Sequence, residues 1–141
     1  MAEGLKIEIV SPERLVLSEV VTSVTVPGTE GYFTVMNDHA PFMTTLRPGF
    51  ITVSGQNNRD EIYFVRGGFA DVSPEGLTIL AEEALPFAEF DHAGLSEQIK
   101  AAEEELERAQ SHEDKSYAQD VVSGLLNLAI EAGQLNGAHV H

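Results

Sequence analysis

Within residues 1–84, one pair of neighbouring side chains, Asp38 and His39, is of a kind that catalyses proton transfer. The pair lies in the stretch YFTVMNDHAPF, between Tyr32 and Phe42. A carboxylate beside an imidazole can orient it as a general base, provided that a nucleophile stands within hydrogen-bond reach. The sequence holds no cysteine and no G-x-S-x-G motif that would expose a serine on a sharp turn. We therefore expect no catalytic residue, and interpret Asn37 and Asp38 as turn residues.

The spacing of the other candidate residues predicts neither a metal nor a cofactor. The remaining histidines are His92, His112, His139 and His141. No two of them have the H-x-x-x-H spacing that places two imidazoles on one helix face. The stretch GTEG at 28–31 lacks the Gly-Lys-Ser/Thr of a phosphate loop. RGGF at 66–69 lies between expected strands, so its two glycines are interpreted as a hairpin turn or bulge.

The charge of the chain limits the classes of partner. Its 141 residues carry a formal net charge of −15 at pH 7, which argues against nucleic acid, because phosphates require a cationic surface. The same charge argues against adhesion to anionic lipid. No apolar run of about 18 residues is present that could insert into a membrane, and the strand-like pattern from Leu5 leaves no room for a targeting peptide. A basic protein partner and simple solubility both fit the charge.

Up to about Ala84 the sequence has the pattern of short strands. LKIEI, VTSVTV, FITVS, EIYFVRG and GLTILAE are separated by turn signals such as Pro27-Gly28. Short β-branched runs at this spacing predict an antiparallel sandwich or barrel, and their alternation buries one face of each sheet. We expect a β-sandwich domain over residues 1–84 and a linker over residues 85–90.

From Asp91 the apolar period changes from 2 to about 3.6 residues, which predicts α-helix. Asp91 is the expected N-cap of a first helix, and Ser111 with Asp114 resembles the capping box of a second. The first apolar stripe is Leu95, Ile99, Ala102, Leu106 and Ala109. The second is Ala118, Val121, Val122, Leu125, Leu128, Ala129 and Ala132. Two such helices joined by a short connection should form an antiparallel hairpin, which makes the fold class α+β.

Glycines set the expected limits and packing of this hairpin. We expect close helix packing at Gly124, since a glycine inside a helix costs up to about 1 kcal/mol against alanine. Gly133 or Gly137 is the expected end of the second helix. The hairpin is thus expected over residues 91–136, followed by a flexible tail over 137–141.

The segment from Val26 to Gly49, VPGTEGYFTVMNDHAPFMTTLRPG, resembles the hallmark segment of the epsilon subunit of F-type ATP synthases. The family pattern, G-x-E-G-x-x-G-[VI]-x-P-G-H-A-P-h-h-T-x-h-[KR]-P-G with h apolar, aligns without a gap. The matching residues are Gly28, Glu30, Gly31, Val35, His39, Ala40, Pro41, Leu46, Arg47, Pro48 and Gly49. YFVRGGFADV, from Tyr63 to Val72, resembles a second family signature. The resemblance covers the whole chain, in the order sandwich, linker and helical hairpin.

The resemblance implies a non-catalytic rotor subunit of the central stalk, in a bacterial enzyme. In that family the β-sandwich packs on the gamma subunit, sits on the loops of the membrane c-ring and couples proton flow to ATP synthesis. The complex lies at the inner membrane, with this subunit peripheral on the cytoplasmic face. The partner-binding residues carried over are Glu30, Gly31, Tyr32, His39, Ala40 and Pro41. The alternatives are a free-standing regulatory module and a small enzyme that uses His39.

The sequence departs from the family pattern in both parts. Tyr32 stands where many members carry a glutamate, and Thr34 replaces a glycine. In the family nucleotide motif, [IL]-D-x-x-R-A, Asp91 is in place but Gly94 replaces the arginine, so we expect weak or absent ATP binding. The second helix carries Lys115 as its only cationic side chain. Because inhibition in the family uses basic residues there to contact the catalytic beta subunit, we expect weak regulation of hydrolysis.

Overall fold

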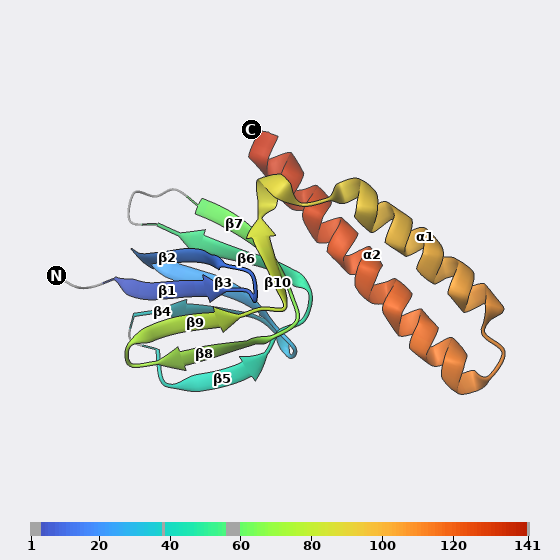
Figure 1. Ribbon diagram of the computed structural model, residues 1–141, viewed down its shortest axis with the longest axis horizontal. Coiled ribbons are helices and arrows are strands. Elements are labelled where there is room, and N and C mark those ends of the chain that lie inside the picture. The colour runs from blue at the N-terminus through green and yellow to red at the C-terminus, as the bar shows by residue number, and fades with distance from the viewer. Residues whose placement is uncertain (1–3, 38, 56–59, 141) are drawn as a thin grey trace. The chain divides into compact units, whose positions relative to one another are not determined.

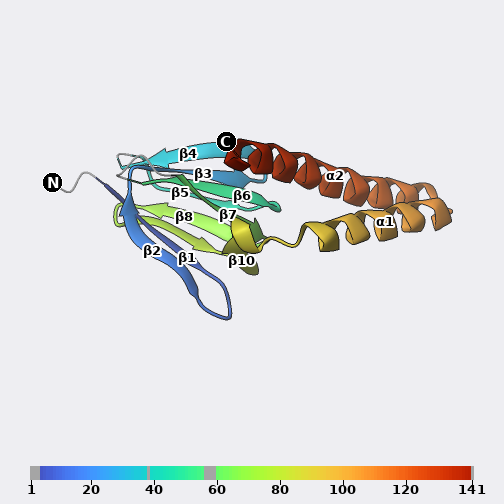
Figure 2. The ribbon, with the colours of Figure 1, turned by 90° about the horizontal axis from the view of Figure 1, so that it is seen from above.

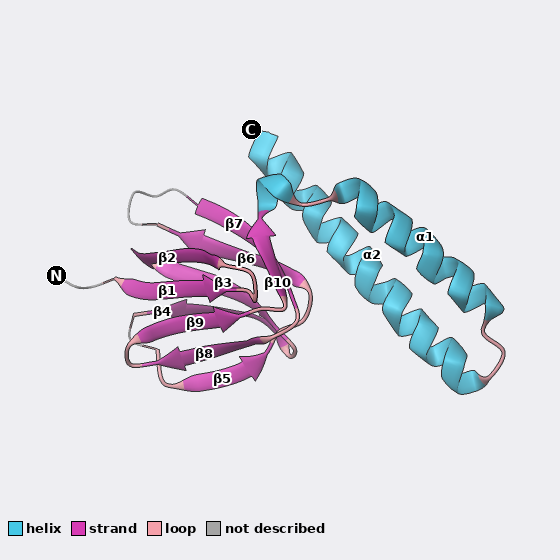
Figure 3. Ribbon diagram, viewed as in Figure 1, coloured by secondary structure: helices cyan, strands magenta, loops and turns pink. Residues whose placement is uncertain are grey.

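The computed structural model describes residues 4–37, 39–55 and 60–140. Its described strands all precede its two long helices along the chain, as Figure 3 shows. The chain divides into two compact units, Met1–Phe90 and Asp91–His141. This confirms the α+β class with a β-rich first part and a helical second part.

The first unit is a sandwich of two five-stranded sheets. The first sheet has the order β2-β1-β9-β8-β5, with β1 Leu5–Val10, β2 Leu15–Val21, β5 Phe42–Thr45, β8 Phe69–Ser73 and β9 Gly76–Leu80. The second has the order β10-β7-β6-β3-β4, with β3 Ser23–Gly28, β4 Gly31–Met36, β6 Gly49–Ser54, β7 Asp60–Arg66 and β10 Glu83–Pro86. Figures 1 and 2 show β1 and β2 in one layer and β3 and β4 in the other.

The pairing of the described strands is antiparallel with one exception. β1 pairs in parallel with β9, with Ile7 opposite Leu77 and Ile9 opposite Ile79. These four side chains are at most 1% exposed, and they meet core residues of the second sheet such as Val53. Fully burying an aliphatic side chain of this size contributes about 1.5–3 kcal/mol. The alternating apolar positions read from the sequence therefore face the space between the sheets.

A separate aromatic cluster covers the other face of β6 and β7. Phe50 and Phe64 are opposite each other in the register of these strands. Their neighbours Ile51 and Val65 belong to the core, so the period of 2 places both rings on the face away from it. The rings of Phe87 and Phe90 close over them: the ring centroid of Phe50 lies 5.5 Å from that of Phe87 and 5.3 Å from that of Phe90.

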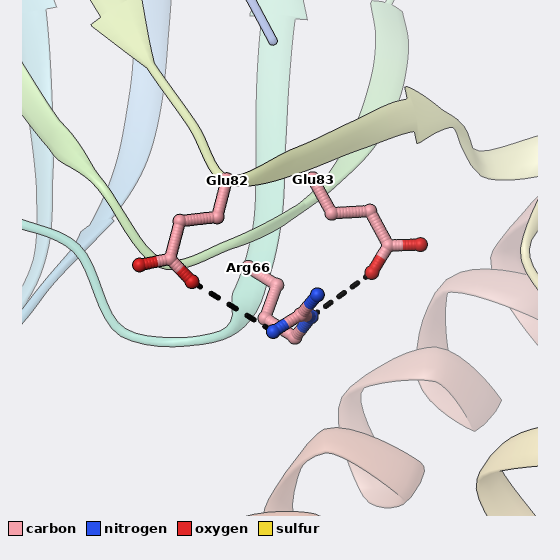
Figure 4. Close-up of polar contacts among 3 residues, drawn as sticks. All are labelled: Arg66, Glu82 and Glu83. Atoms are coloured by element: carbon pink, nitrogen blue, oxygen red, sulfur yellow. Dashed lines mark hydrogen bonds and ion pairs between the residues drawn. The ribbon is translucent and has the colours of Figure 1, made fainter. Parts of the chain in front are cut away.

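The expected linker over residues 85–90 is therefore wrong. Leu85 and Pro86 belong to β10, and a 3-10 helix, η1, spans Phe87–Glu89 with Phe87 buried. Figure 4 shows how Arg66 holds the start of β10, with its Nε 2.9 Å from Glu83 Oε1 and its Nη1 3.8 Å from Glu82 Oε1. Pro86 suggested a break in structure, but proline is tolerated on an edge strand such as β10.

The second unit consists of α1, His92–Arg108, and α2, His112–Val140. Both predicted N-caps are confirmed: the Gly94 N–H donates to Asp91 Oδ1 at 2.8 Å, and the Asp114 N–H donates to Ser111 Oγ at 3.0 Å. In α1 the five residues of the predicted stripe are all buried or half-buried. In α2 the stripe is buried or half-buried except for Val121, which is 36% exposed.

The expectations that rested on the glycines of α2 are wrong. The helix continues through Gly133 and Gly137 to Val140, so residues 137–140 of the tail expected over 137–141 are helical, and His141 lies outside the described residues. A helix-ending glycine takes a positive φ, and the glycines with positive φ in the described residues are Gly31, Gly67, Gly68 and Gly76. A Cβ built on Gly124 meets no atom within 4 Å, so this residue does not mediate the close helix packing expected of it.

Candidate partner interface at the two ends of β4

The structure does not bring the six predicted partner-binding residues into one loop. Glu30, Gly31 and Tyr32 lie at the start of β4, and His39, Ala40 and Pro41 follow its end. At about 3.3 Å of rise per residue, the five steps from Gly31 to Met36 separate the two groups by roughly 16 Å. All six residues are exposed. The expected single contact loop is corrected to two exposed groups at opposite ends of one edge strand.

The first group is the tight turn between β3 and β4. Gly31 has a φ of +131°, a conformation that side chains rarely adopt, although a Cβ there would have open space around it. The turn is fastened to β5, because both the N–H and the hydroxyl of Thr29 donate to the carbonyl of Thr45, at 3.0 and 2.8 Å. The backbone geometry thus fixes Glu30 at the tip with its side chain in solvent.

The second group is the loop between β4 and β5. The His39 N–H donates to the Met36 carbonyl at 3.1 Å, which closes a turn; the interpretation of Asp38 as a turn residue lies outside the described residues. The loop is flanked by apolar side chains that stand largely in solvent: Met36 is 59%, Phe42 46% and Met43 60% exposed. Exposed methionine and aromatic side chains beside a loop are typical of a surface that contacts another protein.

Tyr32 is turned back onto the sheet. Its hydroxyl accepts the Phe50 N–H at 3.2 Å, and the Arg47 guanidinium lies 4.8 Å above the centre of its ring. Continuing the β3–β6 register would place Phe50 opposite Pro27, but the Pro27 carbonyl already accepts the Arg47 N–H at 3.0 Å. Tyr32 therefore completes a backbone hydrogen bond that the ladder leaves unmade.

Replacing Tyr32 with phenylalanine should lower the free energy of unfolding by about 1–2 kcal/mol, because the Phe50 N–H loses its acceptor in a buried position. Urea unfolding followed by circular dichroism measures the change. Tyr117, with 73% of its surface exposed, supplies the matched control, since Tyr117→Phe should leave the stability unchanged. Equal effects of the two substitutions would contradict the structural role of the Tyr32 hydroxyl.

Thr34 is accommodated in a regular cross-strand pair. It lies opposite Thr25 in the β3–β4 register, and the two hydroxyl oxygens are 3.0 Å apart. Opposed threonines that share a hydrogen bond are a favourable pair on the face of a sheet. A threonine therefore fits here without any unusual backbone, although the resembling family has glycine.

Among the described ionisable side chains of the sandwich, Tyr63 has a strongly shifted pKa. Burial raises the pKa of Tyr63 from 10 to about 12, and the Glu61 carboxylate, which accepts the Tyr63 hydroxyl at 3.0 Å, adds to the effect, as does the charge of Glu19. Burial, the hydrogen bond to Glu61 and the negative charges of Glu61 and Glu19 all favour the neutral phenol in the folded state. The raised pKa of Tyr63 stabilises the folded state. This stabilisation is fully present below the unfolded pKa of 10 and is lost as the pH rises through about 12.

Tyr63 should therefore ionise near pH 12 in the folded protein. The chain has three tyrosines and no tryptophan, so absorbance of tyrosinate can be read without interference. The difference between the titration curves of the native chain and Tyr63→Phe isolates this residue, and circular dichroism at each pH verifies the fold. A midpoint near pH 10 in the difference curve would contradict the burial of this hydroxyl.

The residues of the nucleotide motif are engaged in helix capping. Asp91 Oδ1 accepts the Gly94 N–H, and a Cβ on Gly94 would lie 2.3 Å from Asp91 Oδ2. The Asp91 carboxylate thus serves α1, and no side chain at position 94 could coexist with it in this rotamer. Among residues 4–37, 39–55 and 60–140, no group of three His, Cys, Asp or Glu side chains is placed to hold a metal ion.

Sequence reasoning missed the exposed apolar residues Met36, Phe42 and Met43. It also missed Arg47, whose guanidinium lies over the ring of Tyr32. A signal was available for the first three, because large apolar side chains beside a turn are unusual on a soluble surface. Arg47 could not be assigned from its type alone, because its place above Tyr32 depends on the β3–β6 pairing.

Within the part of the chain that the structure describes, neither helix is long and apolar enough to cross a membrane.

Known proteins of one family resemble the chain over most of its length. Residues 4–87 match the family model described as "ATP synthase, Delta/Epsilon chain, beta-sandwich domain". The ATP synthase epsilon chain of Rhizobium etli is 48% identical over 91% of this chain and 95% of its own length. Those of Mesorhizobium japonicum and Sinorhizobium medicae are 47% and 49% identical over the same shares.

Solved structures share the fold at lower identity. A chain in a cryo-EM structure of the Euglena gracilis mitochondrial ATP synthase, OSCP/F1/c-ring, matches with a TM-score of 0.72 and 23% identity, over 99% of this chain and 82% of that one. A chain from the central stalk and c-ring of the Tetrahymena thermophila enzyme matches with a TM-score of 0.62 and 17% identity, over 92% and 96%. With the family model and the close bacterial relatives, these findings lead to one conclusion. The chain belongs to the ATP synthase delta/epsilon family.

Proposed function

We propose that this chain is the epsilon subunit of a bacterial F-type ATP synthase, a non-catalytic part of the central stalk that couples proton translocation to ATP synthesis. The observation that carries the proposal is the 48% identity to a bacterial ATP synthase epsilon chain over 91% of this chain and 95% of that one. The similarity therefore includes the helical hairpin as well as the sandwich. As part of that complex, the chain lies peripherally on the cytoplasmic face of the inner membrane.

The partners of the sandwich are the gamma subunit and the loops of the c-ring. The two exposed groups at the ends of β4 support two separate contacts. The Glu30–Gly31 turn offers a charged tip on a fixed backbone, whereas the loop of His39 to Pro41 is flanked by apolar Met36 and Phe42. Apolar and aromatic side chains of this kind form the centre of protein interfaces.

Co-purification followed by identification of the bound chains tests this function. The tagged chain should bring down a gamma subunit and a proton-translocating complex, and Met36→Ser with Phe42→Ser should reduce the yield of both. Leu126→Ser, at a residue that is 41% exposed in α2, is the control that should retain them. Recovery of the chain alone would favour a free-standing module, and a turnover abolished by His39→Ala would favour an enzyme.

Mg-ATP should not bind this chain with micromolar affinity. Nucleotide phosphates need cationic partners, but Gly94 stands at the arginine position and Asp91 is engaged in capping α1. Isothermal titration of the full chain with Mg-ATP measures the affinity. Micromolar binding would contradict this, and an unchanged affinity in Asp91→Asn would show that the site lies elsewhere.

The hairpin is a weak inhibitor of ATP hydrolysis. From Ser116 to the end of the chain α2 carries no lysine or arginine, so it brings mainly Asp120 and Glu131 towards any acidic partner. Like charges facing each other are unfavourable. Deletion of residues 91–141, which leaves Phe90 in the aromatic cluster, should change the ATPase activity of the complex by less than about twofold.

A further inference from the structure

The two helices enclose a hollow at the connected end of the hairpin. Its volume is about 620 Å³, and it lies between the last turns of α1 and the first turns of α2. The floor is made of small side chains, Ala102, Ala109 and Ala118, each of them half-buried. Because alanine side chains are short, the backbone of a further helix could approach both helices closely.

Large apolar side chains border this floor on α2. Tyr117 is 73% exposed and Val121 is 36% exposed, one helical turn apart. Tyrosine is one of the residue types that contribute most to binding when a partner covers them, because a rigid aromatic ring loses little entropy. Val121 was expected to pack against α1, and its exposure beside Tyr117 shows that the apolar surface of α2 is wider than the hairpin itself uses.

The charges around the hollow have one predominant sign. Glu105 and Asp114 line it, and Arg108, the cationic side chain of the rim, is paired with Glu105 at 3.5 Å. Glu113 and Asp120 are the neighbours of Tyr117 at i−4 and i+3 on the surface of α2. From Asp91 to the end, the sequence has ten carboxylates against three cationic side chains, a net charge of −7.

We propose that this hollow binds a cationic amphipathic helix of another protein. The apolar face of that helix would rest on the alanine floor beside Tyr117, with its lysines or arginines facing Asp114 and Asp120. Helices bind in apolar grooves through residues spaced by three and four positions, which the gap between two packed helices suits. A second copy of this chain is a poor occupant, because its own acidic hairpin would be repelled.

A synthetic amphipathic helix of about 16 residues, with leucines on one face and lysines on the other, is the probe. It carries one tryptophan, and because the full chain has none, the fluorescence reports the peptide alone. Tyr117→Ser should weaken binding by about tenfold or more. Glu105→Gln with Asp114→Asn should weaken it and reduce its dependence on salt.

Ile130→Ser is the matched control. Ile130 is 58% exposed on the same helix, but 13 positions at 3.6 residues per turn place it on nearly the opposite side from Tyr117. This variant should retain the affinity within about twofold. Equal losses in both variants, equal binding of a peptide with glutamates for lysines, or no binding by the native chain would overturn the proposal. A dimer that Tyr117→Ser dissociates would also overturn it, since the occupant would then be a second copy.

Discussion

Replacing Gly68 with alanine is expected to lower the free energy of unfolding of the sandwich by about 3 kcal/mol or more. The residue has a φ of +96°, and a Cβ there would lie 1.9 Å from the Leu80 carbonyl oxygen and 2.8 Å from the Ala81 Cα. Both neighbours are backbone atoms, so no side chain can rotate away. The Gly68 carbonyl also accepts the Leu46 N–H at 2.9 Å, and a shift of the backbone would break that bond.

The variant Gly31→Ala is the control. It separates the backbone strain at a positive φ from the steric clash that a Cβ would make at Gly68. Gly31 also has a positive φ, but no atom lies within 4 Å of a Cβ built on it. The loss of stability in Gly31→Ala should therefore be the strain alone, about 1–2 kcal/mol. Urea unfolding of both variants measures the difference, and a smaller effect at Gly68 than at Gly31 would show that the approach of Leu80 is not as close as described.

Phe50→Ala is expected to cost about 3–5 kcal/mol, the range for removing a buried aromatic ring. Phe50 is 2% exposed, and its ring contacts those of Phe64, Phe87 and Phe90 at centroid distances of 5.7, 5.5 and 5.3 Å. The variant removes the centre of the cluster that holds η1 on the sheet. Limited proteolysis should accordingly cut residues 85–90 faster than in the native chain, while thermal unfolding reports the loss of stability.

Phe42→Ala is the control for this substitution. Phe42 is 46% exposed and pairs with one ring, that of Phe33, at 5.4 Å. Its loss should cost about 1 kcal/mol and leave the rate of cleavage at 85–90 unchanged. A rate that does not rise in Phe50→Ala would mean that β10 alone holds this segment.

The local sequence pattern was sufficient to predict the elements in which the apolar periodicity is unbroken. The stripe from Leu95 to Ala109 and the caps at Asp91 and Ser111 were predicted residue by residue, because spacing and capping depend on neighbours within one turn. β10 was missed because Pro86 reads as a break, although a proline on an edge strand costs no ladder bond. The aromatic side chains of Phe87 and Phe90 indicated burial, but residues 85–90 as a whole had the composition of a linker.

The candidate site depended on pairing between distant strands, which the sequence does not display. The hydroxyl of Tyr32 has a structural use only because the Pro27 carbonyl of β3 accepts the Arg47 N–H and leaves the Phe50 N–H of β6 to the Tyr32 hydroxyl. The separation of Glu30 from His39 follows from the six-residue strand β4 that lies between them, a length that could not be read from the motif. The resemblance supplied the residues, and the topology showed that they belong to two surfaces.

The parallel pairing of β1 with β9 has a consequence for the order in which the chain folds. Ile7 reaches its partner Leu77 across 70 positions, whereas the contacts of α1 and α2 are local. Contacts of large sequence separation close slowly, because the intervening loop must be ordered first. During synthesis β1 leaves the ribosome well before β9 and must therefore wait for it, with its apolar face exposed meanwhile. β1 is therefore synthesised long before it can take its place beside β9.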